Sequence, residues 1–141
     1  MAPAMEWLAK WMSEKHGLTV KVKVAEDVPA ITEDIRVLLF QSVKELLFNA
    51  VKHANVKTVQ LDLAMKSDRM KIIVSDNGAG FDPLQLSING GNAGGFGLLS
   101  DKERLGFMGG SMVVESAPGM GTRITLESPP LTPPKAVRKN A

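Results

Sequence analysis

Four polar side chains recur at helical spacing in the middle of the sequence. Glu45, Asn49, Lys52 and His53 stand at i, i+4, i+7 and i+8, which on a helix confines them to a stripe less than about 110° wide. Carboxylate and amide oxygens suit Mg²⁺, and a lysine supplies a point charge for phosphate oxygens. The stripe is therefore either a site for a polyphosphate and its metal or the solvent face of a helix. A histidine at a helix end is more often a cap or a core-edge residue than a catalyst.

A second group of candidate residues follows an apolar run. Asp76 is succeeded by Asn77-Gly78-Ala79-Gly80-Phe81. In a binding site, Asp76 would accept a hydrogen bond from an exocyclic amine, and the two glycines would let the backbone approach a flat ring. Asn-Gly after a strand is also typical of a hairpin turn. From these residues alone, both interpretations stay open.

Two more glycine motifs follow. Gly94-Gly95-Phe96-Gly97-Leu98 directly precedes a segment with helical spacing, and glycine amides leading into a helix N-terminus can bind an anion. A flexible loop joined to a helix would look the same. Gly119-Met120-Gly121-Thr122 follows Pro118, and this combination is that of an ordinary hairpin turn.

The elements that must position these residues follow from hydrophobic periodicity. A period near 3.6 predicts helices and strict alternation predicts strands. The segment around residues 77–95 is glycine-rich and predicts a lid or a ligand-binding loop. The element order predicts an α+β, two-layer α/β sandwich, in which about three helices cover one face of a mixed, mostly antiparallel sheet. The expected helices span residues 6–16, 33–53 and 98–108, and the expected strands span 18–24, 56–65, 70–76, 111–115 and 122–126.

Length and composition limit the class of protein. A chain of 141 residues, 44% hydrophobic and 23% charged, suits one soluble globular domain. Cysteine is absent, which removes disulfides, thiolate metal sites and thiol nucleophiles. No apolar run reaches the length of a membrane span, and no signal-peptide pattern opens the chain.

The positive charge is concentrated at the C-terminal end. The net charge is +2, and Lys135, Arg138 and Lys139 contribute three positive charges, so the rest of the chain carries −1. A body so near neutrality is a poor nucleic-acid binder. We therefore expect one domain over residues 1–127 and a proline-rich, basic, disordered tail over residues 128–141.

In this combination and order, the motifs resemble the catalytic ATP-binding domain of sensor histidine kinases. That family belongs to a superfamily shared with type II topoisomerases, heat-shock chaperone ATPases and mismatch-repair ATPases. Residues 45–54 match the family's N box, residues 76–81 its first glycine box and residues 95–110 its second, and residues 119–122 resemble its closing GxGT. Within the family, the chain is similar to nitrate-responsive and membrane-stress sensors.

The resemblance implies a Bergerat ATP-binding fold and a site for ATP and Mg²⁺. It makes Asp76 the acceptor for the adenine amine, helped by Gly80 and Thr122, and it makes Asn49 the Mg²⁺ ligand. Glu45 is either a base or a metal-side residue, and that choice stays open. The residues assigned to the nucleotide by position in the motifs are Asn49, Lys52, His53, Asp76, Gly78, Gly80, Phe81, Gly95, Gly97, Leu98 and Thr122.

The implied reaction is transfer of the γ-phosphoryl group to a histidine on a separate dimerisation domain. The implied partners are that domain and a response regulator, and the implied location is the cytoplasm. The resemblance further implies that this domain alone is monomeric and that the parent protein is a dimer, either free or membrane-anchored. Two features depart from the family pattern. Residues 82–94 contain no basic side chain, which leaves Lys102 and Arg104 as candidate phosphate cations, with ion pairing on the helix surface as the alternative for both. His16 lies in the first helix of the ATP-binding domain rather than in an acceptor helix. The alternative function is a stand-alone ATP-binding regulatory module, such as an anti-sigma-factor-like serine kinase.

Overall fold

Alternating apolar residues build a five-stranded sheet. The computed structural model describes residues 2–25, 31–54, 56–66, 68–80 and 95–131. Within them the strand order is β1-β2-β3-β5-β4, with β1 parallel to β2 and every other pair antiparallel. The expected mixed, mostly antiparallel sheet is confirmed. The strands are β1 Thr19–Val24, β2 Thr58–Lys66, β3 Arg69–Asp76, β4 Ser111–Ser116 and β5 Thr122–Glu127.

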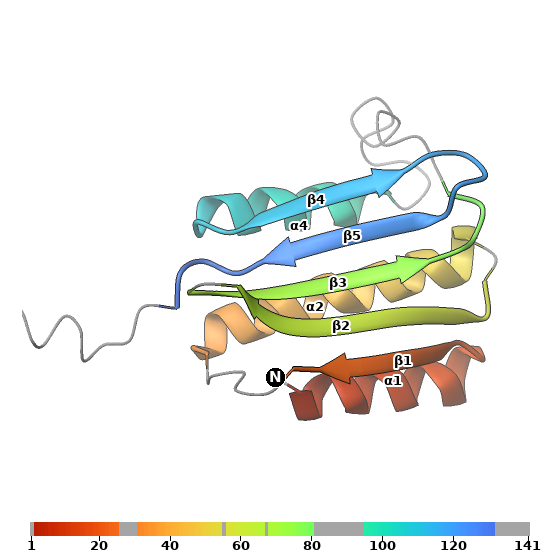
Figure 1. Cartoon of the computed structure of the whole chain (residues 1–141), viewed down its shortest axis with the longest axis horizontal. Helices are drawn as coiled ribbons and strands as arrows, with labels where there is room; N and C mark the ends of the chain where they lie inside the picture. Colours follow the sequence, from red (N-terminus) through yellow and green to blue (C-terminus); the bar gives the residue numbers. More distant parts are fainter. Residues whose placement is uncertain (1, 26–30, 55, 67, 81–94, 132–141) are drawn as a thin grey trace, which may run out of the picture.

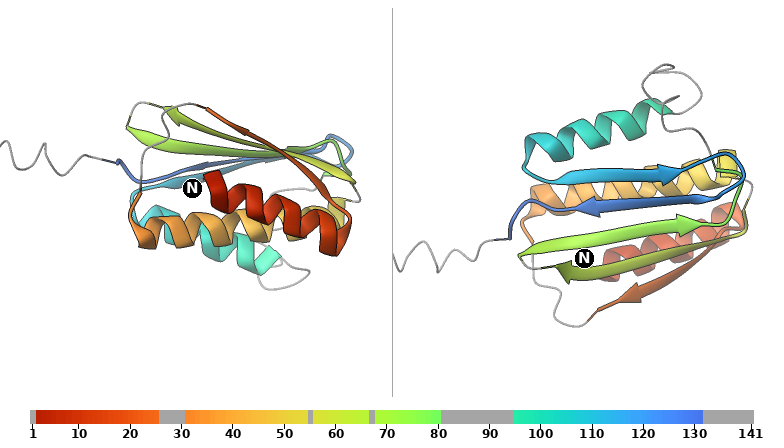
Figure 2. Two further views of the ribbon diagram at one scale, coloured as in Figure 1. Left: turned by 90° about the horizontal axis from the view of Figure 1, so that it is seen from below. Right: turned by 45° about the horizontal axis from the view of Figure 1, so that its top comes forward.

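The described helices all cover one face of this sheet (Figures 1 and 2). They are α1 Ala2–His16, α2 Glu33–Asn49 and α4 Gly95–Phe107, and α2 continues into a π-helical turn, η1 Ala50–Ala54. The helix expected over residues 33–53 is therefore present, but its last turn is widened. Helix α1 begins before the expected residue 6, because Pro3 is tolerated in a first turn. None of the described helices combines the length and apolar character needed to cross a membrane.

The core lies between the two layers. Every second residue of β2 and β3 is buried, and the buried faces of α1 and α2 pack against them. Each such aliphatic side chain contributes about 1.5–3 kcal/mol by leaving water. This packing fixes how α2 is rotated over the sheet, and so fixes which of its residues remain at the surface. The core includes Met5, Leu8, Met12, Leu39, Val43, Leu47, Leu61, Leu63, Ile72, Val74, Leu105 and Leu126.

The chain stays in contact with the sheet beyond the expected domain end at residue 127. The Ser128 amide donates to the Met70 carbonyl at 2.9 Å, and the Met70 amide donates to Ser128 Oγ at 2.9 Å. The Leu131 amide donates to the Asp68 carbonyl at 2.7 Å. The contacting part of the chain thus reaches Leu131. The expectation of a disordered tail now concerns residues 132–141, which lie outside the described residues.

Candidate functional site

The sequence motifs gather at one end of the two-layer structure. The C-terminal end of α2, the end of β3 and the turn between β4 and β5 all lie there, and α4 begins toward the same end (Figures 1 and 2). These segments are far apart in the sequence. The fold therefore brings the four motif regions into one neighbourhood, built on the ends of rigid elements.

Asp76 and Thr122 are cross-strand neighbours. They face each other in the β3–β5 register, and Thr122 also faces Ser116 in the β4–β5 register. Ser116 Oγ lies 2.9 Å from Thr122 Oγ1 and donates to the Gly121 carbonyl at 2.9 Å. The hydroxyl assigned to the adenine side is thus held beside the assigned acid.

Glycines lock the loop after β3 against the β4–β5 turn. Gly80 has φ +68°, and a Cβ there would collide with the Ala117 carbonyl oxygen; Gly121 has φ +77°, and a Cβ there would collide with the Asp76 carbonyl oxygen. The Gly119 amide donates to the Ala79 carbonyl at 2.5 Å. In this structure the two glycines therefore let two loops approach each other.

The hairpin interpretation of Asn77-Gly78 is wrong. A tight hairpin would pair β3 with the strand that follows it among the described residues, which is β4. Instead β3 lies between β2 and β5, and β4 is the far edge of the sheet. The Asn-Gly pair therefore starts a long connection and leaves Asp76 at an open strand end.

The Asp76 carboxylate is half-buried and only partly engaged. Its Oδ1 accepts a hydrogen bond from the Gly78 amide at 2.8 Å, a turn typical of Asp. No other hydrogen bond to this carboxylate comes from the described part of the chain. Oδ2 can therefore accept from an amine of a ligand while Oδ1 holds the loop.

The polar stripe of α2 is partly as expected. Glu45 and Asn49 are half-buried one turn apart, whereas Lys52 is exposed and its ammonium lies 5.9 Å from the centre of the Phe48 ring. Phe48 also contacts the rings of Trp11 and His16, at 5.9 Å and 5.0 Å between centroids. The Lys52 ammonium thus lies on the α1 side of α2, and reaching a phosphate requires it to leave a ring contact of roughly 0.5–1 kcal/mol.

The π-helical turn η1 carries the second half of the stripe. Five-residue spacing widens the helix, and such turns are frequent at functional sites. Lys52 and the backbone of His53 lie in it. The side chain of His53 lies outside the described part of the structure, so its expected role remains a prediction.

The second glycine motif forms the first turn of α4 rather than a loop in front of it. Gly95, Gly97 and Leu98 are helical. Because the first four amides of a helix have no intrahelical acceptor, the amides of these residues could donate to an anion. The Leu98 side chain and the whole of Phe81 lie outside the described residues.

Sequence reasoning missed Asp101. This residue of α4 is only 7% exposed, and burial first and the charge of Glu45 second raise the pKa of its carboxyl, against a lowering effect of Arg104. Asp101 is thus within electrostatic reach of Glu45 on α2. Its position three residues after Leu98 and four before Leu105 could have placed it on the apolar face. Lys102 and Arg104, by contrast, are exposed.

The donor groups on α2 fit Mg²⁺ in chemistry. Asn49 offers an amide oxygen and Glu45 a carboxylate one turn away, and Mg²⁺ typically takes few protein ligands and keeps water and substrate phosphates. Among the described residues, no group of three or more acidic or histidine side chains could hold a metal by itself. A metal here would have to be shared with phosphate oxygens.

Comparison with known proteins is consistent with this geometry. Residues 34–133 match a family model described as histidine kinase-, DNA gyrase B- and HSP90-like ATPase. The chain is 29% identical to the kinase/phosphatase DegS of Brevibacillus brevis, over 92% of the chain and 32% of DegS. It is 32% identical to UhpB of Salmonella typhimurium, over 92% of the chain and 24% of UhpB. The chain thus spans a third or less of the length of these relatives.

The fold also matches solved structures. Full-length ShkA, crystallised with AMPPNP, superposes with a TM-score of 0.73 at 24% identity, covering 93% of this chain and 30% of ShkA. At this identity the likeness concerns the fold.

Proposed function

We propose that this chain binds ATP with Mg²⁺ and transfers the γ-phosphoryl group to a histidine of a separate dimerisation domain. The reason is that the chain belongs to the family of histidine kinase-, DNA gyrase B- and HSP90-like ATPases. It is a histidine kinase ATPase domain of the kind found in two-component sensor kinases. The acceptor domain and a response regulator are the proposed partners, and the cytoplasm is the proposed location. The relatives are histidine kinases, which favours histidine over serine as the acceptor.

The observation that supports the proposal best is the pairing of Asp76 with Thr122 at the strand end. One oxygen of the half-buried carboxylate accepts from Gly78, the other has no hydrogen-bond donor among the described residues, and a hydroxyl lies on the neighbouring strand. An acid and a hydroxyl fit the amine edge of adenine. The interlocked glycine loops hold this pair in place, which lowers the ordering cost of binding.

The remaining residues are assigned to the phosphate end. Asn49 and Glu45 would face the metal and its phosphates, and the amides of Gly95, Gly97 and Leu98 would hold phosphate oxygens. Bound Mg²⁺ would neutralise charge on the phosphates. Catalysis would then consist mainly of positioning and charge neutralisation, the usual pattern in phosphoryl transfer.

Calorimetric titration with ATP, ADP and GTP, each with and without Mg²⁺, tests the proposal. We expect ATP and ADP to bind, Mg²⁺ to strengthen ATP binding, and GTP to bind at least about tenfold more weakly, a difference of about 1.4 kcal/mol. The reason is that guanine has a carbonyl where adenine has the amine that would donate a hydrogen bond to Asp76. Equal affinity for GTP and ATP would remove the assignment of Asp76, and no nucleotide binding at all would remove the proposed function.

A further inference from the structure

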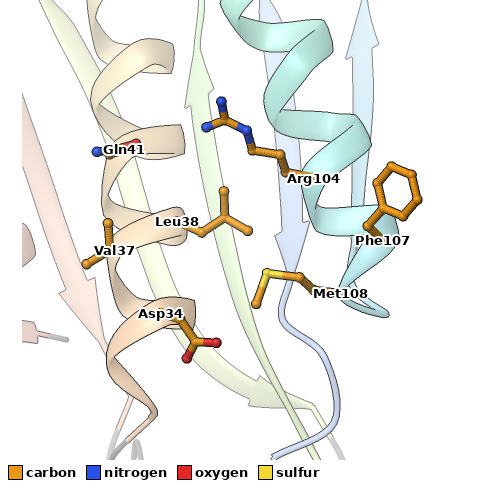
Figure 3. A pocket seen from close by; sticks show the side chains of 7 residues that line it. All are labelled: Asp34, Val37, Leu38, Gln41, Arg104, Phe107 and Met108. Atoms are coloured by element: carbon orange, nitrogen blue, oxygen red, sulfur yellow. The ribbon is translucent and has the colours of Figure 1, made fainter.

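A groove of about 350 Å³ lies between the first two turns of α2 and the last turn of α4, apart from the residues assigned to the nucleotide. Figure 3 shows Asp34 at one end of it and Arg104 at the other, with apolar side chains between them. Phe107 is 93% exposed and Val37 is 46% exposed. Clustered apolar exposure of this kind commonly marks an interaction site. The apolar lining residues are Val37, Leu38, Phe107 and Met108.

The described chain ends close to this groove. Gly109, the residue after Met108, lies beside Pro129, because a Cβ on Gly109 would be 3.9 Å from the Pro129 Cβ. Arg69 Nη1 links the segments around Gly109 and Ser128, because it donates to the Gly109 carbonyl at 2.7 Å and to the Ser128 carbonyl at 3.2 Å. Residues 132–141 therefore start near the end of the groove that Met108 and Asp34 occupy.

The composition of residues 132–141 complements the groove. The segment has prolines at 133 and 134, a valine at 137, three cations and no acid. Proline-containing segments are already extended and dock on exposed aromatic side chains at low entropic cost. At about 3 Å per residue, ten residues reach roughly 30 Å, whereas the α2 wall from Asp34 to Gln41 is about 10 Å long.

The charged residues at the two ends of the groove favour one orientation of the basic segment. Asp34 and the neighbouring Glu33 are exposed at the near end, and a hydrogen bond from Thr32 lowers the pKa of Asp34. The acidic side chains of Asp34 and Glu33 attract the cations of the segment. Arg104 stands at the far end and repels them, which keeps the cations close to the N-terminus of α2.

We propose that residues 132–141 of this chain occupy the groove between α2 and α4, with Pro133 and Pro134 against Phe107 and the cationic residues toward Asp34 and Glu33. The segment then covers apolar surface of its own domain and links the end of α4 to the start of α2.

Paramagnetic relaxation in the full chain tests this proposal. The chain has no cysteine, so Ala136→Cys creates a single attachment point for a nitroxide spin label. We expect the amide signals of Val37, Gln41 and Met108 to lose more intensity than those of β1, and the loss to be unchanged on dilution. Adding salt should reduce it, because part of the attraction is between charges.

Two substitutions in the labelled chain make the test specific. Phe107→Ser removes an exposed ring without touching the core, and it should abolish the selective intensity loss. Val113→Ser is the matched control, because Val113 is 51% exposed on β4, on the sheet face opposite to buried Met112, and it should leave the loss intact. Even broadening over the whole domain would overturn the proposal. A selective loss that disappears on dilution would also overturn it, since a second copy would then be the occupant.

Discussion

Asp76 divides its two carboxylate oxygens between the fold and the proposed ligand. Oδ1 accepts from the Gly78 amide, and an asparagine can keep that bond through its own oxygen. The other position becomes an NH₂ group, which cannot accept from the adenine amine. We predict that Asp76→Asn weakens ATP binding by about 1–3 kcal/mol, the cost of an unsatisfied buried polar pair, with little change in melting temperature.

Calorimetry on the purified domain measures this effect. The control is Asp62→Asn on β2. Asp62 pairs with Ile73 in the middle of the sheet, away from the strand ends, and its carboxylate accepts a hydrogen bond from Gln60 Nε2. Unchanged affinity in the Asp76 variant, or an equal loss in both variants, would remove the adenine assignment.

Asn49 is predicted to act through the metal. Alanine keeps the helix, because it has the highest helix propensity, but it removes the amide oxygen. Asn49→Ala should therefore reduce the Mg²⁺-dependent gain in ATP affinity by about tenfold, or about 1.4 kcal/mol, and leave Mg²⁺-free ADP binding nearly unchanged. Gln41→Ala, an exposed amide two turns earlier on α2, is the control. If both nucleotides lose affinity equally with and without Mg²⁺, Asn49 is not a metal-side residue.

At the scale of elements, the β4–β5 turn contains a matched pair of glycines. Gly119 has φ +81° with open space around its Cβ position, whereas a Cβ on Gly121 would collide with the Asp76 backbone. Gly119→Ala should cost only the left-handed backbone strain, about 1–2 kcal/mol. Gly121→Ala should cost more than about 3 kcal/mol, because a steric clash with backbone is added, and it should also weaken ATP binding by moving Asp76.

Denaturant midpoints and nucleotide titrations of the two variants separate these effects. The comparison cancels the backbone strain that both positions share. Should the two alanines cost the same, the interlocked loops would not be what holds Asp76.

The carboxyl group of Asp101 on α4 makes an unfavourable, pH-dependent contribution to the free energy of folding. Burial and the charge of Glu45 raise the pKa of Asp101 above its ordinary value of 3.8, so ionising Asp101 favours the unfolded chain. This penalty is absent well below that value, grows as the pH rises through the raised pKa, and is complete above it. Asp101→Asn should therefore stabilise the domain by about 1 kcal/mol near neutral pH and progressively less toward about pH 4.

Thermal melting at several pH values checks the sign. Glu103→Gln removes an exposed carboxylate from the same helix and should show no such trend. A stabilisation that is constant with pH would mean that Asp101 acts through packing rather than through its charge.

At the scale of the whole molecule, the layers could be predicted and the contacts between loops could not. Alternation in residues 18–24 predicted a strand that is observed within one or two residues, because a half-buried strand must alternate. The register that sets Asp76 opposite Thr122 depends on β5 inserting between β3 and β4, and no local pattern encodes that order. The same holds for the contact of Gly80 with Ala117.

Two features near the candidate site were not predicted from the sequence, each for a different reason. Asp101 is not one of the residues that the four motifs assign to the nucleotide, although its spacing with Leu105 places it on the inner face of the helix. The π-helical turn at Ala50–Ala54 had no visible signal, since the residues after Asn49 continue a helical pattern. The motifs therefore predicted where the candidate site lies, and the fold decided how the side chains of each motif are placed around it.

The proposal that the acceptor histidine belongs to another domain makes a prediction for the chain as a whole. The chain has two histidines, His16 and His53, and the His16 ring packs edge-on against Trp11 and Phe48, with centroids at 5.3 Å and 5.0 Å. A ring held in this way is poorly placed for in-line attack on a bound γ-phosphate, because attack needs close approach and alignment of the reacting atoms. Incubation with γ-labelled ATP and Mg²⁺ should give no stable label, whereas a dimerisation domain from a related kinase, added in trans, should become labelled at histidine. Acid-labile label on the chain alone, lost on His16→Gln, would show that this domain carries its own acceptor.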